Sequence, residues 1–174
     1  ILVKQADLTG ETADVVIVNL FQGVTMPAGA TGAADAALNG AIREVIAAGD
    51  FTGKAGETVV LYPRGQMPAR RVLVVGLGGA DKFNLAGVRH AAAVAARKAR
   101  DLGAQTVATI VHGAGIGGLD PQAAAQAVVE GTLLGLYRFA GYRSKQSKDW
   151  KANPATLLVL VRDAGHVDSI EAGV

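Results

Sequence analysis

Apolar residues along this chain fall into two patterns, short continuous runs and segments that repeat with a helical period. The continuous runs have the length of buried strands and occupy residues 15–20, 57–62, 71–76, 105–111 and 156–161. A loop with two prolines and a glycine joins the second run to the third, which predicts an antiparallel hairpin. Nothing in the last run alternates, so we expect that strand to lie in the interior of the sheet.

Three segments place apolar side chains at helical spacing and carry helix boundary signals. They predict helices over residues 33–48, 84–102 and 121–139. Asp120 followed by Pro121 is a strong helix start, because the carboxylate caps free backbone amides and proline has no N–H to leave unbonded. Asn84 is placed to cap the second helix, and Gly49 and Gly103 are placed to end the first and the second. The core-facing side of the third helix is expected to carry Val129, Leu133 and Leu136.

Strands and helices alternate after the first third of the chain, which is typical of the α/β class. We therefore expect a mixed, mostly parallel sheet flanked by helices on both faces, in a three-layer αβα arrangement. The chain has 174 residues, of which 50% are hydrophobic and 18% charged. That length and composition predict one compact domain spanning residues 1–174.

Charge, cysteine content and the length of apolar runs narrow the class of protein. The 17 basic and 15 acidic residues give a formal net charge of +2, which does not require a nucleic-acid partner. Because the sequence has no cysteine, disulfides and thiolate metal sites are excluded, and we expect a cytoplasmic location. No apolar run is long enough to span a bilayer, so we expect no membrane partner.

A glycine-rich segment between a predicted strand and a predicted helix is the first candidate ligand site. Gly113, Gly115 and Gly118 match the Gly-x-Gly-x-x-Gly pattern, whose backbone amides can cradle phosphate at a helix N-terminus. The helix is expected to begin only at Asp120, whose carboxylate would occupy those amides and repel an anion. A tight structural turn is therefore the favoured interpretation, with nucleotide binding as the alternative.

Asn19 is the second candidate ligand residue. It ends the run Asp14-Val15-Val16-Ile17-Val18-Asn19, which follows Asp7-Leu8-Thr9. This opening resembles that of macro domains, which bind ADP-ribose and also use a glycine-rich loop late in the chain. Gln22 stands where macro domains usually carry a second asparagine. The resemblance implies the fold, and ADP-ribose or nucleotide binding at Asn19, Gly113, Gly115 and Gly118 is the alternative that it leaves open.

A basic and aromatic stretch follows the third predicted helix. Residues 138–151 carry five basic side chains and one acidic side chain, interleaved with aromatic residues. Such an arrangement can hold phosphates and stack bases, which makes DNA a candidate partner through Arg138, Arg143, Lys145 and Lys148. The favoured alternative is a solvated loop whose aromatic residues anchor the helix end.

No candidate catalytic or metal-binding residue emerges from the sequence. The three histidines, His90, His112 and His166, are isolated, and none shows a ligand spacing such as His-x-x-x-His. Each is expected to be structural or solvent-facing. A Gly-x-Ser-x-Gly elbow is missing, and the carboxylates are scattered rather than clustered as a two-metal hydrolase requires.

Several segments, in this order and spacing, resemble the N-terminal domain of the leucyl (cytosol) aminopeptidase family. They are Gly49 to Glu57, Val72 to Gly78, Phe83 to Ala96, Glu130-Gly131 and Tyr137 to Lys145. The resemblance implies a macro-like fold and a parent enzyme that removes N-terminal residues from peptides, using two divalent ions, zinc or manganese. It also implies a homohexamer assembled largely through its catalytic domains.

The metal ligands of that family lie in C-terminal motifs such as Asn-Thr-Asp-Ala-Glu-Gly-Arg, and this string is absent here. No catalytic residue can therefore be assigned to any position of this sequence. The resemblance thus implies a non-catalytic domain that contacts its own catalytic domain and other subunits and is inactive alone. A nucleotide-binding module and a DNA-binding module are the two alternatives.

Overall fold

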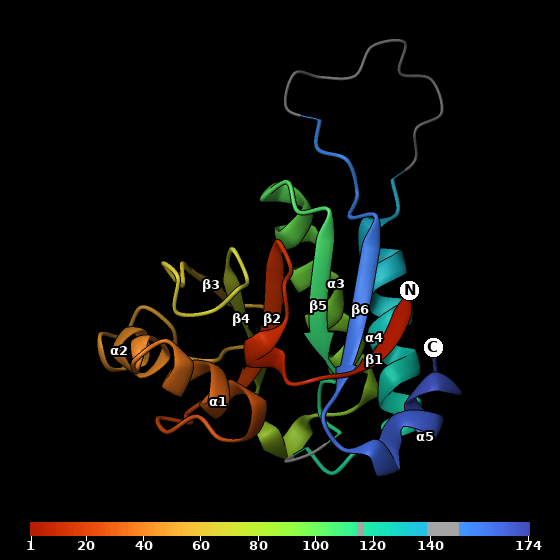
Figure 1. Ribbon diagram of the computed structural model, residues 1–174. Coiled ribbons are helices and arrows are strands. Elements are labelled where there is room, and N and C mark those ends of the chain that lie inside the picture. The colour runs from red at the N-terminus through yellow and green to blue at the C-terminus, as the bar shows by residue number, and fades with distance from the viewer. Residues whose placement is uncertain (115–116, 139–149) are drawn as a thin grey trace.

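A computed structural model of the chain describes residues 1–114, 117–138 and 150–174. Within these ranges one mixed sheet holds β1 (Leu2–Gln5), β2 (Val15–Phe21), β3 (Thr58–Leu61), β4 (Val72–Gly78), β5 (Thr106–Ile110) and β6 (Thr156–Val161). The strand order is β1-β6-β5-β2-β4-β3, and only β3 runs antiparallel to its neighbour (Figure 1). The predicted hairpin and the interior position of β6 are both confirmed.

Helices cover both faces of the sheet, as predicted. They are α1 (Gly29–Ala37), α2 (Ala41–Ala47), α3 (Leu85–Asp101), α4 (Pro121–Leu136) and α5 (Val167–Glu171). The first two lie on one face, and the other three lie on the opposite face (Figure 1). None of these described helices is both long enough and apolar enough to cross a membrane.

The central strand β2 shows why the apolar runs in this chain are continuous. Val15 and Ile17 pack into the cluster formed with α3 and α5, whereas Val16 and Val18 pack with α1 and α2. Successive side chains of a strand point to opposite faces, so a strand covered on both sides needs apolar residues at every position.

The layer of α3 and α4 depends on very close backbone contact. A Cβ atom added to Gly131 of α4 would lie 2.3 Å from the carbonyl oxygen of Arg89 on α3. A Cβ atom on Gly135 would lie 2.7 Å from Cα of Ala93. Beside this contact, Arg89 Nε donates to Glu130 Oε2 over 2.6 Å, which joins the two helices at their partly exposed side.

The predicted helix over residues 33–48 is wrong in one respect, because two helices occupy that segment. Asn39 and Gly40 both have positive φ, at 54° and 88°, and this left-handed pair breaks the helix. The buried carboxylate of Asp35 then accepts from the amides of Ile42 and Arg43 and caps α2. The apolar periodicity continues across the break, which is why the pattern suggested one helix.

The third predicted helix begins as expected but ends earlier. Asp120 accepts from the amide of Ala123, and α4 ends at Leu136 because Tyr137 is extended. The predicted end at Phe139 lies outside the described residues. Val129 and Leu136 are buried as expected, but Leu133 is 58% exposed. Thr132 takes the buried position instead, because each helical step turns the side chain by about 100°.

The close approach of α4 to α3 predicts a specific response to Gly131→Ala. Alanine favours an isolated helix over glycine by about 1 kcal/mol, so the substitution would stabilise α4 if only helix propensity mattered. Here the added methyl group meets the backbone of α3. We expect the free energy of unfolding to fall by about 1–3 kcal/mol in urea titrations.

Gly10→Ala is the matched control, because a Cβ atom at Gly10 meets nothing within 4 Å. We expect this control to change stability by no more than about 0.5 kcal/mol. A stabilised Gly131→Ala variant would show that α3 and α4 are not in such close contact.

Candidate functional site

A cleft of about 390 Å³ lies at the carboxyl ends of the parallel strands β2, β5 and β6. This edge of a parallel sheet is where α/β proteins commonly bind ligands. Asn19 and Gly113, both candidates from the sequence, line the cleft together. Gly118 is not among the lining residues, and Gly115 lies outside the described residues.

The turn at Gly113 has a structural reason for its glycine. Its φ is 83°, and a Cβ atom there would lie 2.6 Å from the ring of Phe83 and 2.9 Å from Leu119. The carbonyl of Gly113 also accepts from the amide of Leu119. These contacts support the tight-turn interpretation, and ligand binding by the loop stays a prediction.

Asn19 makes a hydrogen bond that the sequence did not indicate. Its Nδ2 group donates to Nδ1 of His112 over 2.8 Å, across 93 residues of sequence. The backbone carbonyl of Asn19 accepts from the hydroxyl of Thr31 on α1. The asparagine therefore joins β2 to the segment after β5 and to the first helix, and it holds one wall of the cleft in place.

His112 is almost completely buried, with 1% of its surface exposed, so the solvent-facing alternative is wrong for this histidine. Burial lowers the pKa of this imidazole from 6.5 to about 4, because the charged form loses its hydration. The side chain is consequently neutral at pH 7. Since Nδ1 accepts from Asn19, the single proton is on Nε2.

The polar groups of the cleft come from segments that are distant in sequence. Arg162, Asp163 and His166 follow β6, and Thr31 lies in the first turn of α1. The N-terminus of α1 lacks a side-chain cap, because Ala28 occupies the capping position. The combination of polar side chains and uncapped backbone amides suits the binding of a small polar molecule. The sequence did not indicate these residues, because no local motif connects them.

No metal site is visible in the described parts of the chain, where no group of three or more His, Cys, Asp or Glu side chains could hold an ion. Carboxylates with lowered pKa serve the fold instead. Asp14 accepts from the amides of Thr106 and Gln105, and these bonds lower the pKa of its carboxyl group. Glu57 likewise accepts from Thr52 and Lys54, and its carboxyl pKa is also lowered.

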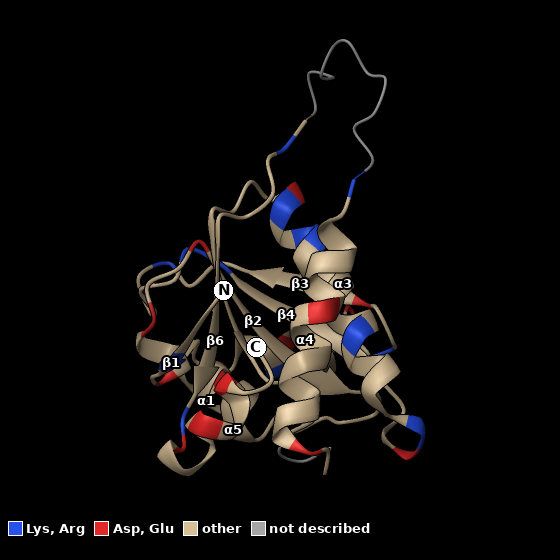
Figure 2. Ribbon diagram, turned by 90° about the vertical axis from the view of Figure 1, so that its right-hand side faces the viewer, with Lys and Arg blue, Asp and Glu red and all other residues tan. Residues whose placement is uncertain are grey.

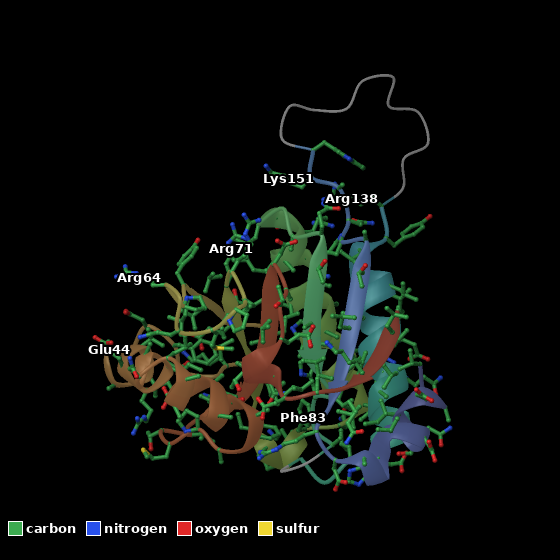
Figure 3. All side chains as sticks on the ribbon, in the orientation of Figure 1. Glu44, Arg64, Arg71, Phe83, Arg138 and Lys151 are labelled. Carbon is green, nitrogen blue, oxygen red and sulfur yellow. The ribbon has the colours of Figure 1, made fainter. Side chains whose placement is uncertain are left out.

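The basic stretch begins at the opposite end of the molecule, beyond the last turn of α4. Arg138 donates to the carbonyl of Lys151, and its guanidinium lies 4.5 Å from the ring centroid of Trp150. Arg138, Lys151 and Arg71 lie near this end, whereas Phe83 lies at the other (Figure 3). The remaining candidates for DNA contact, Arg143, Lys145 and Lys148, lie outside the described residues.

The C-terminal turns of α3 bring further positive charge to the same end. Blue segments of the ribbon mark basic residues at the end of this helix in Figure 2, next to the end of α4. They are Arg97, Lys98 and Arg100. Asp101 pairs with Arg100 and offsets one of these charges. DNA binding at this end stays a prediction.

The fold is that of the macrodomains. The chain is similar to a Trypanosoma brucei macrodomain in complex with ADP, with a TM-score of 0.75 and 16% identity over 97% of this chain and 66% of that chain. It is equally similar in fold to a tomato leucine aminopeptidase mutant, with a TM-score of 0.73 and 22% identity over 97% of this chain and 34% of the other.

Sequence comparison then gives the family. Residues 15–146 match the N-terminal domain of the cytosol aminopeptidase family. A probable cytosol aminopeptidase of Roseiflexus castenholzii is 33% identical over 144 residues, which cover 83% of this chain. The chain belongs to the cytosol aminopeptidase family. It spans 27% of the length of the Roseiflexus relative.

The buried neutral His112 predicts a pH-dependent stability. Its pKa is about 4 in the folded chain and 6.5 without burial, so the unfolded chain binds more protons between these values. The stability that the neutral imidazole contributes is therefore fully present above pH 6.5, and it is lost as the pH falls from 6.5 toward 4. We expect the free energy of unfolding to fall by about 2 kcal/mol from pH 7 to pH 5.

His112→Phe should remove most of this difference between the two pH values, whatever its effect on stability at pH 7. Urea unfolding at both pH values measures it, and His90→Gln, at an exposed position, is the control. Equal pH dependence in wild type and His112→Phe would refute the assignment.

Proposed function

We propose that the chain is the non-catalytic N-terminal domain of a cytoplasmic, metal-dependent leucyl aminopeptidase. In this role it shapes and supports the enzyme without taking part in the chemistry. The proposal is supported by the match of residues 15–146 to the N-terminal domain of the family. It is further supported by the length of the match, because the chain corresponds to 27% of the Roseiflexus relative.

Catalysis in this proposal belongs to a separate domain of the same protein. That domain would hold two divalent ions, zinc or manganese, and would cleave N-terminal residues from peptides. The present domain would contribute contacts to the catalytic domain and to other subunits of a homohexamer. None of its residues is proposed as a metal ligand.

An exposed apolar surface on α4 supports an interaction role. Leu134 and Tyr137 are 73% and 71% exposed, and Leu133 is 58% exposed. Leu133 and Leu134 lie in the last turn of α4, and Tyr137 directly follows that helix. Adjacent large apolar side chains in solvent are characteristic of surfaces that another protein covers. We assign this α4 surface, made of Leu133, Leu134 and Tyr137, to contact with the rest of the enzyme.

A chimera tests this function. The matching segment of the Roseiflexus aminopeptidase is replaced by this chain, and hydrolysis of leucyl p-nitroanilide and oligomeric mass are measured with Mn²⁺ or Zn²⁺. We expect the chain alone to be inactive and the chimera to be active with the parental mass. Hydrolysis by the chain alone that EDTA abolishes would overturn the non-catalytic role.

The α4 surface is tested in the same chimera with Leu133→Lys and Leu134→Lys together. Two buried cations at an interface should weaken assembly at least tenfold, measured by the concentration at which the oligomer dissociates. Met26→Lys is the control, since Met26 is 65% exposed and lines the cleft rather than the C-terminal end of α4. Unchanged assembly in the double variant would remove the α4 surface from the proposal.

Nucleotide binding is a second candidate function, favoured by the position of the cleft. Asn19 and Gly113 meet at the carboxyl edge of the sheet, where Arg162 supplies a cation. The similar macrodomain of Trypanosoma brucei is a complex with ADP. We propose that ADP-ribose, or a related nucleoside diphosphate, occupies this cleft.

Calorimetric titration with ADP-ribose tests this candidate. We expect a Kd below about 1 mM and an affinity at least fivefold lower for Arg162→Ala, because the variant loses a charge-assisted contact to phosphate. Lys151→Ala, at the opposite end of the sheet, should bind like wild type. A flat titration at millimolar ligand would eliminate nucleotide binding.

A further inference from the structure

A second cavity, separate from the cleft, lies between the sheet and the layer of α3 and α4. Its volume is about 250 Å³. The lining atoms are mainly apolar and come from both layers, among them Ile17, Val107, Leu157, Ala95, Val128 and Thr132. The α3 residues that line this space are alanines, Ala92, Ala95 and Ala96, whose short side chains leave room between the helix and the strands.

The cavity reaches solvent near the amino ends of β1 and β6. Ile1, Leu133 and Pro154 line it there, and Ile1 and Leu133 are partly exposed. A small molecule could therefore enter without unfolding the domain. The volume exceeds the ~150 Å³ of an apolar protein cavity known to bind benzene.

His112 gives this apolar space one directional polar group. The imidazole lines the cavity while its Nδ1 atom accepts from Asn19, which lines the cleft instead. Its Nε2–H is then the remaining donor. Among the described residues, the hydrogen bond to Asn19 is the one that the structure gives this side chain.

The other polar side chains of the cavity restrict the charge of an occupant. The hydroxyl of Thr109 is engaged with the carbonyl of Ile110, and Thr132 is a neutral alcohol. No Lys, Arg, Asp or Glu is among the described residues that line the space. A charged molecule would lose its hydration there without gaining a counter-charge, which is costly.

We propose that this cavity binds a small, uncharged, largely apolar molecule whose single acceptor oxygen, as in a ketone or ester, receives a hydrogen bond from His112 Nε2. The apolar body of the ligand packs between the alanines of α3 and the sheet. The site is separate from the cleft, and it meets the α4 surface at Leu133, which lines its opening. It requires neither a metal nor a nucleotide.

Three probes of similar size distinguish the parts of this proposal. Acetophenone has an aromatic ring and one carbonyl acceptor, isopropylbenzene replaces the carbonyl oxygen by a methyl group and so lacks the acceptor, and benzoate carries a charge. Binding is followed by methyl NMR, in which the signals of Ile17, Val107 and Leu157 report on the cavity. Signals of Ile42 and Val72, in the core on the other face of the sheet, serve as internal controls.

We expect saturable shifts of the cavity signals with acetophenone, at an affinity about fivefold higher than that of isopropylbenzene, as one hydrogen bond provides. Benzoate should leave these signals in place. His112→Phe should remove the preference for acetophenone while isopropylbenzene still binds. Thr132→Leu should fill the space and abolish the binding of both, which keeps the test decisive if His112→Phe does not fold.

Any one of the following results would overturn the proposal. The first is that none of the probes shifts the cavity signals. The second is that benzoate shifts them as strongly as acetophenone. The third is that Thr132→Leu leaves both affinities unchanged, or that a folded His112→Phe protein keeps the preference for acetophenone.

Discussion

The contact between the backbones of α3 and α4 is the constraint on which the rest of this domain depends. Glycines at 131 and 135 let α4 approach α3 at a distance that no side chain would allow. That approach joins two helices into one closely packed layer over the sheet. The space left beneath the alanines of α3 and the exposed leucines at the end of α4 both follow from this placement.

The hydrogen bond between Asn19 and His112 is the second organising contact. It is made by a strand residue and a loop residue that are 93 positions apart, and its two partners face different spaces. Asn19 lines the cleft at the edge of the sheet, while His112 lines the cavity under the helices. Because the imidazole is buried and neutral, Nε2–H is its remaining donor among the described residues, and the same burial makes the pair sensitive to acid.

The described surfaces divide the domain into two ends with different chemistry. The carboxyl edge of the sheet carries the cleft, with backbone turns and a few mixed polar groups. The end at which α4 stops carries exposed apolar and aromatic side chains beside basic ones. The two proposed roles, binding of a small molecule at the cleft and contact with protein at the α4 surface, therefore use different residues.

Much of the architecture was predictable from sequence, because the signals involved are local. Continuous apolar runs identified five of the strands, and the caps at Asn84 and Asp120 identified the starts of α3 and α4. The edge strand β1 was not predicted because it is largely exposed. The helix α5 was missed because it is too short for its two core-facing residues, Val167 and Ile170, to show a helical repeat. The break at Asn39 and Gly40 was also missed, since backbone conformation there overrides the periodicity.

The sequence by itself therefore determined the class of fold, the order of its elements and the family resemblance, all of which rest on patterns between near neighbours. Only the tertiary structure decided which polar residues meet. Asn19 was a candidate from its motif, but its partner His112 and the cavity behind it depend on how β2, β5 and α3 pack together. Distances between residues far apart in the chain are set by that packing, and no local pattern encodes them.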